Sequence, residues 1–140
     1  MSGDAELLNF IYQNSQMGVD TIRQLIGVVE DKDLKEHLKT QFQGYEEFHQ
    51  AAKELLNEHG YDEKGLGIVE KARTYFMINL QTMTDPSASH IASMLITGSS
   101  IVEAIQKYRQ YEDADPKIRD LMDKLRKFEE HNMEKLKDFL

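Results

Sequence analysis

Apolar residues recur at spacings of three and four along almost the whole chain, and this pattern constrains the fold more than any other feature. It is clearest before Gly60, at Leu34, Leu38, Phe42, Tyr45, His49, Ala52 and Leu56. Side chains at these spacings lie on one face of an α-helix, whereas the strict alternation typical of a β-strand occurs nowhere in the sequence. The sequence therefore predicts an all-α protein.

Capping and helix-ending residues divide this pattern into separate helices. Asp31-Lys-Asp33 interrupts it and supplies an acidic cap for the helix that carries the residues just named. Gly60 follows the stretch just described, and glycine adopts the left-handed conformation at a helix C-terminus more easily than any other residue. Further along, Asp85-Pro86 offers a capping side chain followed by proline at the first helical position. Asp115-Pro116 repeats this start signal. We expect one long helix to begin at each pair.

The lengths of the predicted helices favour a bundle. Four helices of about 23 to 28 residues would each be roughly 35–42 Å long at 1.5 Å per residue, and short turns force such neighbours to lie antiparallel. We expect two antiparallel helical hairpins, at residues 4–59 and 86–139, joined by a long helical connection at about 65–82. This connection either crosses from one end of the bundle to the other or covers one face. Residues 1–140 are expected to form a single domain.

The composition excludes several classes of function. The 140 residues carry 17 basic and 25 acidic side chains, which gives a formal net charge of -8 without any lysine or arginine cluster. We therefore expect no nucleic acid and no membrane among the partners, and no apolar run approaches the ~18 residues of a transmembrane span. The absence of cysteine excludes disulfides and thiol catalysis, and it fits a cytoplasmic location.

The two predicted hairpins are similar to each other when the sequence is shifted by 83 residues. The matched pairs include Val19 with Val102, Ile22 with Ile105, Leu38 with Leu121, Tyr45 with Phe128, Glu46 with Glu129, and His49 with Asn132. Because the turns, the core positions and the aromatic-Glu-Glu sequence agree at this one offset, the sequence indicates an internal repeat.

A glutamate three residues before a histidine is the candidate for a metal site. Glu46 and His49 have this spacing, which places both groups on one helix face within reach of one ion. Here the chain resembles the ferritin-like superfamily, in which a Glu from each of two helices and a Glu-x-x-His motif from each of the other two meet around two metal ions. From its hairpin lengths and its links at residues 57–60 and 113–116, it looks closest to small bacterial ferritin-like proteins of unknown function. The resemblance implies a ferritin-like four-helix bundle with one crossover.

The resemblance carries over four positions as candidate metal ligands. Glu46 and His49 match one Glu-x-x-His motif of the family. Glu129 matches the start of the second motif, where Asn132 replaces the histidine. One imidazole, two carboxylates and one weak amide ligand are therefore present.

The facing positions on the other two long helices depart from the family pattern. None of them is acidic: Asn14, Ser15, Gly18, Thr97, Gly98 and Ile101. The nearest acids, Asp20 and Glu103, are expected to point away from the apolar face of their helices. The pattern therefore disfavours a two-ion, oxygen-activating oxidase or peroxidase.

A purely structural role for these polar residues is the main alternative to a metal site. His49 would donate a hydrogen bond to Asn14 on the facing helix, with Ser15 making room for the ring. Asn132 and Thr97 would form the equivalent pair in the second hairpin. Such a layer fixes helix register when it is fully hydrogen-bonded.

We favour a non-enzymatic scaffold that self-associates or binds another protein. The missing acids support it, and Tyr-Phe-Met-Ile at residues 75–78 makes the connecting helix apolar on more than one face, as an interface would require. The alternative is a protein that binds a single divalent ion, Fe, Mn or Zn, through Glu46, His49 and Glu129, with Asn132 nearby. The expected partner is accordingly a second copy or another protein, and the expected cofactor is none or one divalent metal ion.

Overall fold

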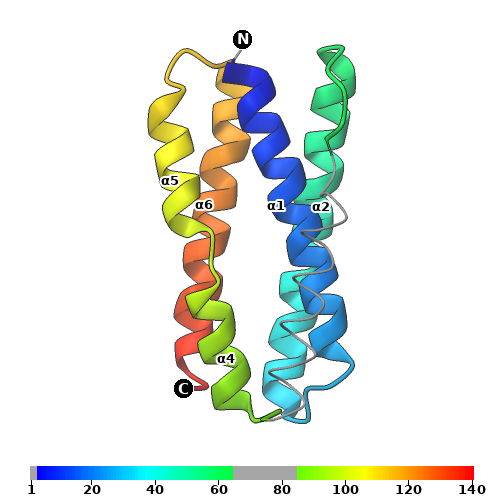
Figure 1. Ribbon diagram of the computed structural model, residues 1–140, viewed down its shortest axis with the longest axis vertical. Helices are drawn as coiled ribbons and strands as arrows, with labels where there is room; N and C mark the ends of the chain where they lie inside the picture. The colour runs from blue at the N-terminus through cyan, green and yellow to red at the C-terminus, as the bar shows by residue number, and fades with distance from the viewer. Residues whose placement is uncertain (1–2, 65–84) are drawn as a thin grey trace.

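The computed structural model describes residues 3–64 and 85–140. Throughout these ranges the regular secondary structure is helical and no strand occurs, which confirms the all-α prediction for this part of the chain. The helices are α1 (Gly3–Ile26), α2 (Lys32–Glu58), α4 (Ala88–Thr97), α5 (Ile101–Gln110) and α6 (Pro116–Lys137) (Figure 1). The predicted connecting helix at 65–82 lies outside the described residues.

The predicted capping residues act at three helix ends. The Asp31 side chain accepts a hydrogen bond from the Leu34 backbone N–H and caps α2. The Asp115 side chain accepts from the Lys117 N–H and caps α6. Gly60 has φ of 72° just after α2, so the chain leaves this helix through the left-handed conformation that glycine allows.

The segment after Pro86 differs from the single long helix that we expected. Ser87 caps α4 by accepting from the His90 N–H, so the helix begins two residues later than predicted. The helix also ends at Thr97, and α5 starts afresh at Ile101.

Glycine followed by two serines produces the interruption between α4 and α5. Gly98 is costly inside a helix, and serine hydroxyls compete with the backbone for hydrogen bonds. Here Ser99 Oγ accepts from the Ile101 N–H, and Ser100 Oγ contacts Asn14 on α1. Side-chain hydrogen bonds therefore replace part of the helical ladder at residues 98–100.

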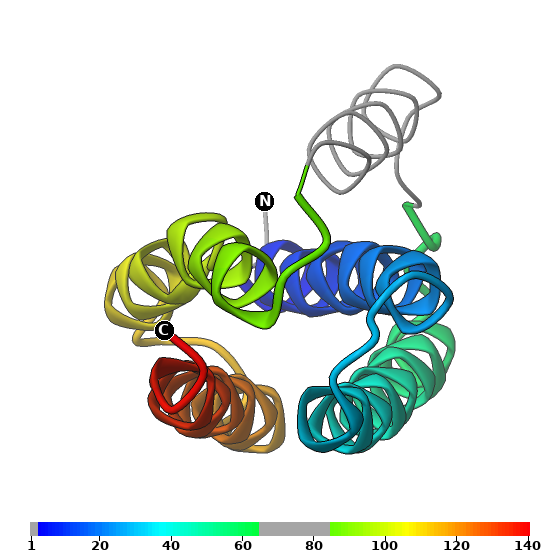
Figure 2. The same ribbon diagram turned by 90° about the horizontal axis from the view of Figure 1, so that it is seen from below.

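The helices pack lengthwise as a bundle. α1 and α2 run antiparallel and make the most extensive contact, while α6 contacts α1, α2, α4 and α5 (Figure 1). Seen along the helices, α2 and α6 lie on one side of the bundle, and α1, α4 and α5 lie on the other (Figure 2). The end of α2 and the start of α4 are at opposite ends of the molecule (Figure 1).

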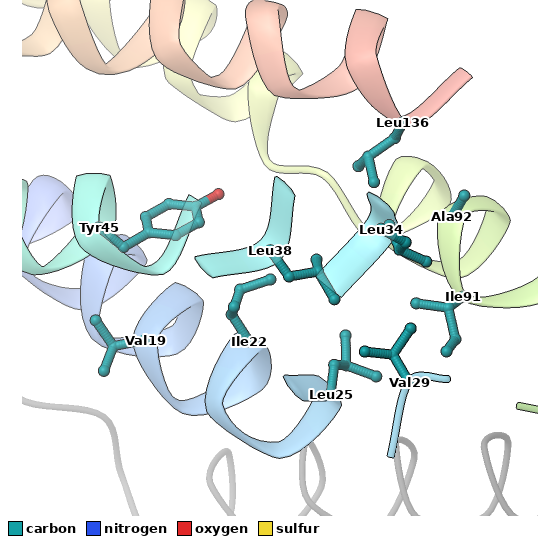
Figure 3. Packing of buried hydrophobic residues seen from close by; sticks show 10 residues of the cluster. All are labelled: Val19, Ile22, Leu25, Val29, Leu34, Leu38, Tyr45, Ile91, Ala92 and Leu136. Carbon is teal, nitrogen blue, oxygen red and sulfur yellow. The ribbon is translucent and has the colours of Figure 1, made fainter. Parts of the chain in front are cut away.

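Two apolar clusters fill the two ends of the bundle. In one, side chains from α1, α2, α4 and α6 point toward one another around Leu25, Leu38 and Ile91 (Figure 3). The other is built around Leu8, Leu56 and further residues of α5 and α6. The buried polar side chains of the described residues are Ser15, Gln41, Glu129 and Asn132. Ser15 on α1 and Glu129 and Asn132 on α6 lie between the residues of the two clusters, and Gln41 lies between Leu38 and Tyr45 of the first. The middle of the bundle is therefore polar.

Two glycines allow the helices to approach one another at this level. A Cβ added to Gly18 would lie 2.5 Å from Tyr45 Cγ, so the aromatic ring of α2 packs directly on the α1 backbone. A Cβ added to Gly44 would lie 2.2 Å from Phe128 Cε1, which places the α6 ring on the α2 backbone. The two rings meet edge to face, with centroids 5.0 Å apart.

The buried faces of α2 and α6 correct the predicted repeat offset. The buried residues match at an offset of 84, as in Leu34 with Ile118, Leu38 with Met122, Tyr45 with Glu129, and Ala52 with Leu136. The predicted offset of 83 is therefore one residue short for this pair of helices, which corresponds to a rotation of about 100° around the helix axis.

One described stretch has the length and composition of a membrane span. Ala88–Gln110 reaches a mean hydropathy of 1.2 in an 18-residue window, and 17% of that window is buried. From the sequence we expected no apolar run close to the length of a membrane span, and this stretch departs from that expectation. A single candidate of this kind is weak evidence for a membrane span, and the break at residues 98–100 interrupts the helix.

Candidate functional site

A buried carboxylate stands at the centre of the polar middle of the bundle. Glu129, on α6, is only 5% exposed. Its Oε1 accepts a hydrogen bond from Asn14 Nδ2 of α1 at 2.8 Å, and its Oε2 accepts from the Tyr45 hydroxyl of α2 at 3.1 Å. Ser100 Oγ, at the break between α4 and α5, lies 3.3 Å from Oε1. Side chains from three other parts of the bundle therefore converge on the carboxyl group of Glu129.

The hydrogen bonds around Glu129 all run in one direction. Ser100 has one hydroxyl proton, and its shorter contact is to Asn14 Oδ1 at 2.6 Å, so Ser100 donates to Asn14. The Asn14 amide in turn donates to Glu129. On the other side, Gln41 makes a side-chain hydrogen bond to Tyr45, which donates to Glu129. Both chains of donors end at the carboxylate.

The surroundings of Glu129 act on its charge in opposite ways. Burial raises the pKa of the Glu129 carboxyl above its usual value, and the hydrogen bonds from Asn14, Tyr45 and Ser100 offset only part of that increase. The pKa of the Tyr45 hydroxyl is raised well above its usual value by burial and by the Glu129 charge beside it. None of the ion pairs formed by the described residues includes Glu129. Its negative charge is thus stabilised by neutral donors and not by a cation.

His49 has a separate environment between α2 and α1. Its ring stacks on Tyr12 with centroids 4.2 Å apart, and its Nδ1 lies 3.2 Å from the Tyr12 carbonyl oxygen. Ser15 Oγ donates to a backbone carbonyl and lies 3.4 Å from the same Nδ1. The Asn14 amide, which we predicted as the partner of His49, bonds to Glu129 instead. That prediction is wrong because Asn14 lies on the side of α1 that faces α6.

The structure separates the four predicted metal ligands. Glu129 and Asn132 are both buried and line one cavity. Glu46 is exposed on the surface of α2, and His49 is half-buried against Tyr12, outside the lining of that cavity. Among the described residues, no group of three or more His, Cys, Asp or Glu side chains is arranged to hold a metal ion.

The two acids expected to point away from the middle of the bundle lie toward its surface. Asp20 is 3.8 Å from Arg23 on the same helix and accepts from the Gln16 amide. Glu103 is exposed at the rim of the cavity. Among the described residues, neither acid forms a hydrogen bond or ion pair with His49, and the carboxylate inside the bundle is that of Glu129.

A cavity of about 360 Å³ adjoins Glu129 and is partly open to solvent. Its polar lining includes Asn14 on α1, Gln41 and Tyr45 on α2, Ser99 and Ser100 at the break, and Glu129 and Asn132 on α6. Two buried atoms in this lining, Gln41 Oε1 and Asn132 Nδ2, have no hydrogen-bond partner among the described residues. The residues around the cavity therefore include a buried carboxylate and two amide side chains with one unpaired atom each.

The sequence analysis found Glu129 and Asn132 but missed Gln41 and Ser100. Gln41 was missed because Phe42 was assigned to the apolar face of the helix. Gln41 fits a buried face equally well by spacing, since it lies three residues after Leu38 and four residues before Tyr45. Ser100 was missed because residues 86–110 were expected to be one helix. The Gly-Ser-Ser sequence at 98–100 was the available signal for a break.

Comparison of the chain with protein-family models, with curated proteins and with solved structures finds no match.

Proposed function

We propose that the protein is a non-enzymatic helical bundle that binds a small polar molecule in the cavity beside Glu129. The observation that carries this proposal is the pair of buried atoms without partners, Gln41 Oε1 and Asn132 Nδ2, which line the same cavity as a buried carboxylate. A polar ligand that bonds to them would remove the cost of leaving them unpaired.

The energetic argument concerns the cost of these unpaired groups. A buried donor or acceptor left without a partner costs about 1–3 kcal/mol, and domains are stable by only about 5–15 kcal/mol. Both side chains are at least nine-tenths buried, with Gln41 5% and Asn132 4% exposed. Two such groups beside a buried charge would consume a large share of the stability of the bundle. Ordered water or a bound ligand is required to satisfy them.

The size of the cavity favours a ligand over a few isolated waters. Sites for small molecules typically have volumes of about 300–1,000 Å³, and the volume here of about 360 Å³ falls within that range. A single metal ion would leave most of this space unfilled.

The proposal is tested by a screen of small polar compounds against the full chain by ¹H–¹⁵N NMR. The side-chain amide signals of Gln41 and Asn132 are the reporters. We expect at least one compound among simple amines, alcohols, amides and carboxylates to give saturable shifts at both reporters. If no compound in a varied set moves them at millimolar concentration, the cavity holds only water and the proposal fails.

Self-association is a second candidate, and a separate observation favours it. Val102, on α5, is 62% exposed, within the apolar stretch Ala88–Gln110. Only 17% of the 18-residue apolar window in that stretch is buried, and an apolar stretch left this exposed is typical of protein interfaces. A second copy of the chain is the occupant that we propose. Light scattering coupled to size exclusion tests it, since a strict monomer at high concentration would exclude it.

For the fold, we propose the ferritin-like arrangement of two hairpins with one crossover. Support comes from the antiparallel pairing of α1 with α2 and from the start of α4 at the opposite end of the bundle from the end of α2 (Figure 1). The binding of one divalent ion, the cytoplasmic location, and the absence of nucleic-acid and membrane partners stay predictions.

A further inference from the structure

We propose that the ligand of this cavity is a small organic cation that carries a primary ammonium group and a neutral hydrogen-bond acceptor. This inference rests on the proposed function and adds the chemical class of the ligand. It follows from the charges that line the cavity, from the direction of the hydrogen bonds, and from the two atoms that lack partners.

The charge of the cavity favours a cation. Two carboxylates, Glu129 inside and Glu103 at the rim, are among its described lining residues, and no lysine or arginine is. The whole chain carries a formal net charge of -8, which further raises the local concentration of cations. An anion would have to be buried beside Glu129 without a positive partner, and this arrangement is strongly unfavourable.

The direction of the hydrogen bonds calls for donors on the ligand. Asn14 and Tyr45 each donate to one oxygen of Glu129, and each carboxylate oxygen keeps further acceptor capacity. Gln41 is held with its amide group toward the Tyr45 hydroxyl, which leaves Gln41 Oε1 as a second acceptor. An ammonium group has three N–H donors and no acceptor, so it can bond to a carboxylate oxygen and to an amide oxygen together.

The second unpaired atom adds an acceptor to the description of the ligand. Asn132 follows Glu129 by three residues on α6, so the two side chains lie on the same face of the helix. Asn132 Nδ2 is a donor without a partner among the residues described. A hydroxyl or carbonyl oxygen close to the ammonium group of the ligand would accept from it.

The size of the cavity limits the ligand to a small molecule. A volume of about 360 Å³ corresponds to roughly a dozen waters at about 30 Å³ each. A ligand of a few to about ten non-hydrogen atoms therefore fits, together with some water at the open side. A bare metal ion fits the site less well, because Glu129 is the only carboxylate buried among the described lining residues.

Matched small molecules separate the chemical classes in an NMR titration of the full chain. Ethanolammonium has the proposed ammonium and hydroxyl groups, 1-propanol is its neutral isostere, and glycolate is a small anion with the same hydroxyl. We expect saturable shifts at the Gln41 and Asn132 amides with ethanolammonium, and at least tenfold weaker binding of the other two. Magnesium and zinc ions are titrated separately as metal probes.

Variants test whether the cavity groups are responsible. Glu129→Gln keeps the shape but removes the charge, and it should weaken ethanolammonium binding at least tenfold. Glu130→Gln is the matched control, because Glu130 is exposed and pairs with Arg126 on the surface. It should leave binding unchanged. Gln41→Met removes the second acceptor while keeping a side chain of similar size, and it should also weaken ethanolammonium binding about tenfold. This variant tests the role of the cavity groups if Glu129→Gln does not fold.

The outcomes distinguish the two proposals. The cation assignment is overturned if 1-propanol or glycolate binds as tightly as ethanolammonium. It is also overturned if ethanolammonium binds the Glu129 and Gln41 variants as tightly as the unaltered protein. In both cases the cavity is still a ligand site. Zinc or magnesium binding that depends on Glu129, without ethanolammonium binding, would overturn the cation assignment in favour of a metal. If none of these probes and no compound of the wider screen moves either amide, the proposed function itself fails.

Discussion

Replacing Gly18 with alanine tests whether Tyr45 packs directly on the backbone of α1. The added Cβ would lie 2.5 Å from Tyr45 Cγ and 2.6 and 2.7 Å from the two Cδ atoms. Ordinary contact begins at about 3.4 Å, so the ring has to move by nearly 1 Å. Because Cγ lies on the axis of the Cβ–Cγ bond, turning the ring about that bond cannot remove the overlap. Tyr45 has to change its χ1 angle, or the α2 backbone must shift.

The expected cost is the difference between two effects. Overpacking of this kind costs about 1–3 kcal/mol, and the closeness of the contact places it in the upper half of that range. Alanine in place of glycine inside a helix returns about 1 kcal/mol. We therefore expect Gly18→Ala to lower the free energy of unfolding by about 1–2 kcal/mol, or the melting temperature by a few degrees.

Urea unfolding followed by circular dichroism measures this change. Gly27→Ala is the matched control, because its added Cβ would be 3.4 Å from the nearest atom, the Gln24 carbonyl oxygen. Gly27 is exposed in the turn after α1, so the substitution should be neutral or slightly stabilising. A Gly18→Ala protein as stable as the Gly27→Ala protein would refute the packing argument.

A double-mutant cycle identifies Tyr45 as the cause. In a Tyr45→Ala background the ring is gone, so Gly18→Ala should become neutral or stabilising, and the coupling energy should be about 1–3 kcal/mol. An equal loss of stability in both backgrounds would mean that another contact, and not the Tyr45 ring, accounts for the effect.

Three further predictions concern charge and association. Because the pKa of Glu129 is raised, the folded state loses stability as pH rises from 4.5 through that pKa. Glu129→Gln should abolish this loss in urea unfolding, and an unchanged dependence of stability on pH would contradict the prediction. The pKa of His37 is lowered by burial and by the nearby His131 and Lys135, so stability should fall as pH drops below 6.5. His37→Gln should reduce that fall, and an equal dependence of stability on pH in both proteins would contradict this role of His37. Val102→Glu should shift any dimer toward monomer in light scattering while the circular-dichroism spectrum stays helical, whereas an unaffected dimer would place the interface elsewhere.

The all-α fold was predictable because helical periodicity is a local property of the sequence. The caps at Asp31 and Asp115 and the left-handed turn at Gly60 were equally local, and the structure shows them at the expected places. The interruption at residues 98–100 was not predictable in this way. A helix can contain glycine and serine, and the break depends on tertiary contacts of the Ser100 hydroxyl, which donates to Asn14 on α1 and lies 3.3 Å from Glu129 Oε1 on α6.

The candidate site was predictable only in part. Glu129 was expected to point inward as the counterpart of Glu46, yet Glu46 is exposed and Glu129 is buried. The offset of 84 between the buried faces explains the difference, since Tyr45 is the residue that corresponds to Glu129. Sequence similarity between two amphipathic helices does not fix their rotation around the axis, because packing against different neighbours decides it.

The central claim is that a buried carboxylate faces a cavity made for a small cation. A ¹³C NMR titration of the Glu129 side-chain carboxyl tests it most directly, with Glu129→Gln used to assign the signal. The account predicts a pKa above the usual 4.5 in the free protein and a lower pKa when ethanolammonium is added, because a bound cation favours the charged form. A Glu129 carboxyl whose pKa has its usual value and does not change when ethanolammonium is added would contradict the account.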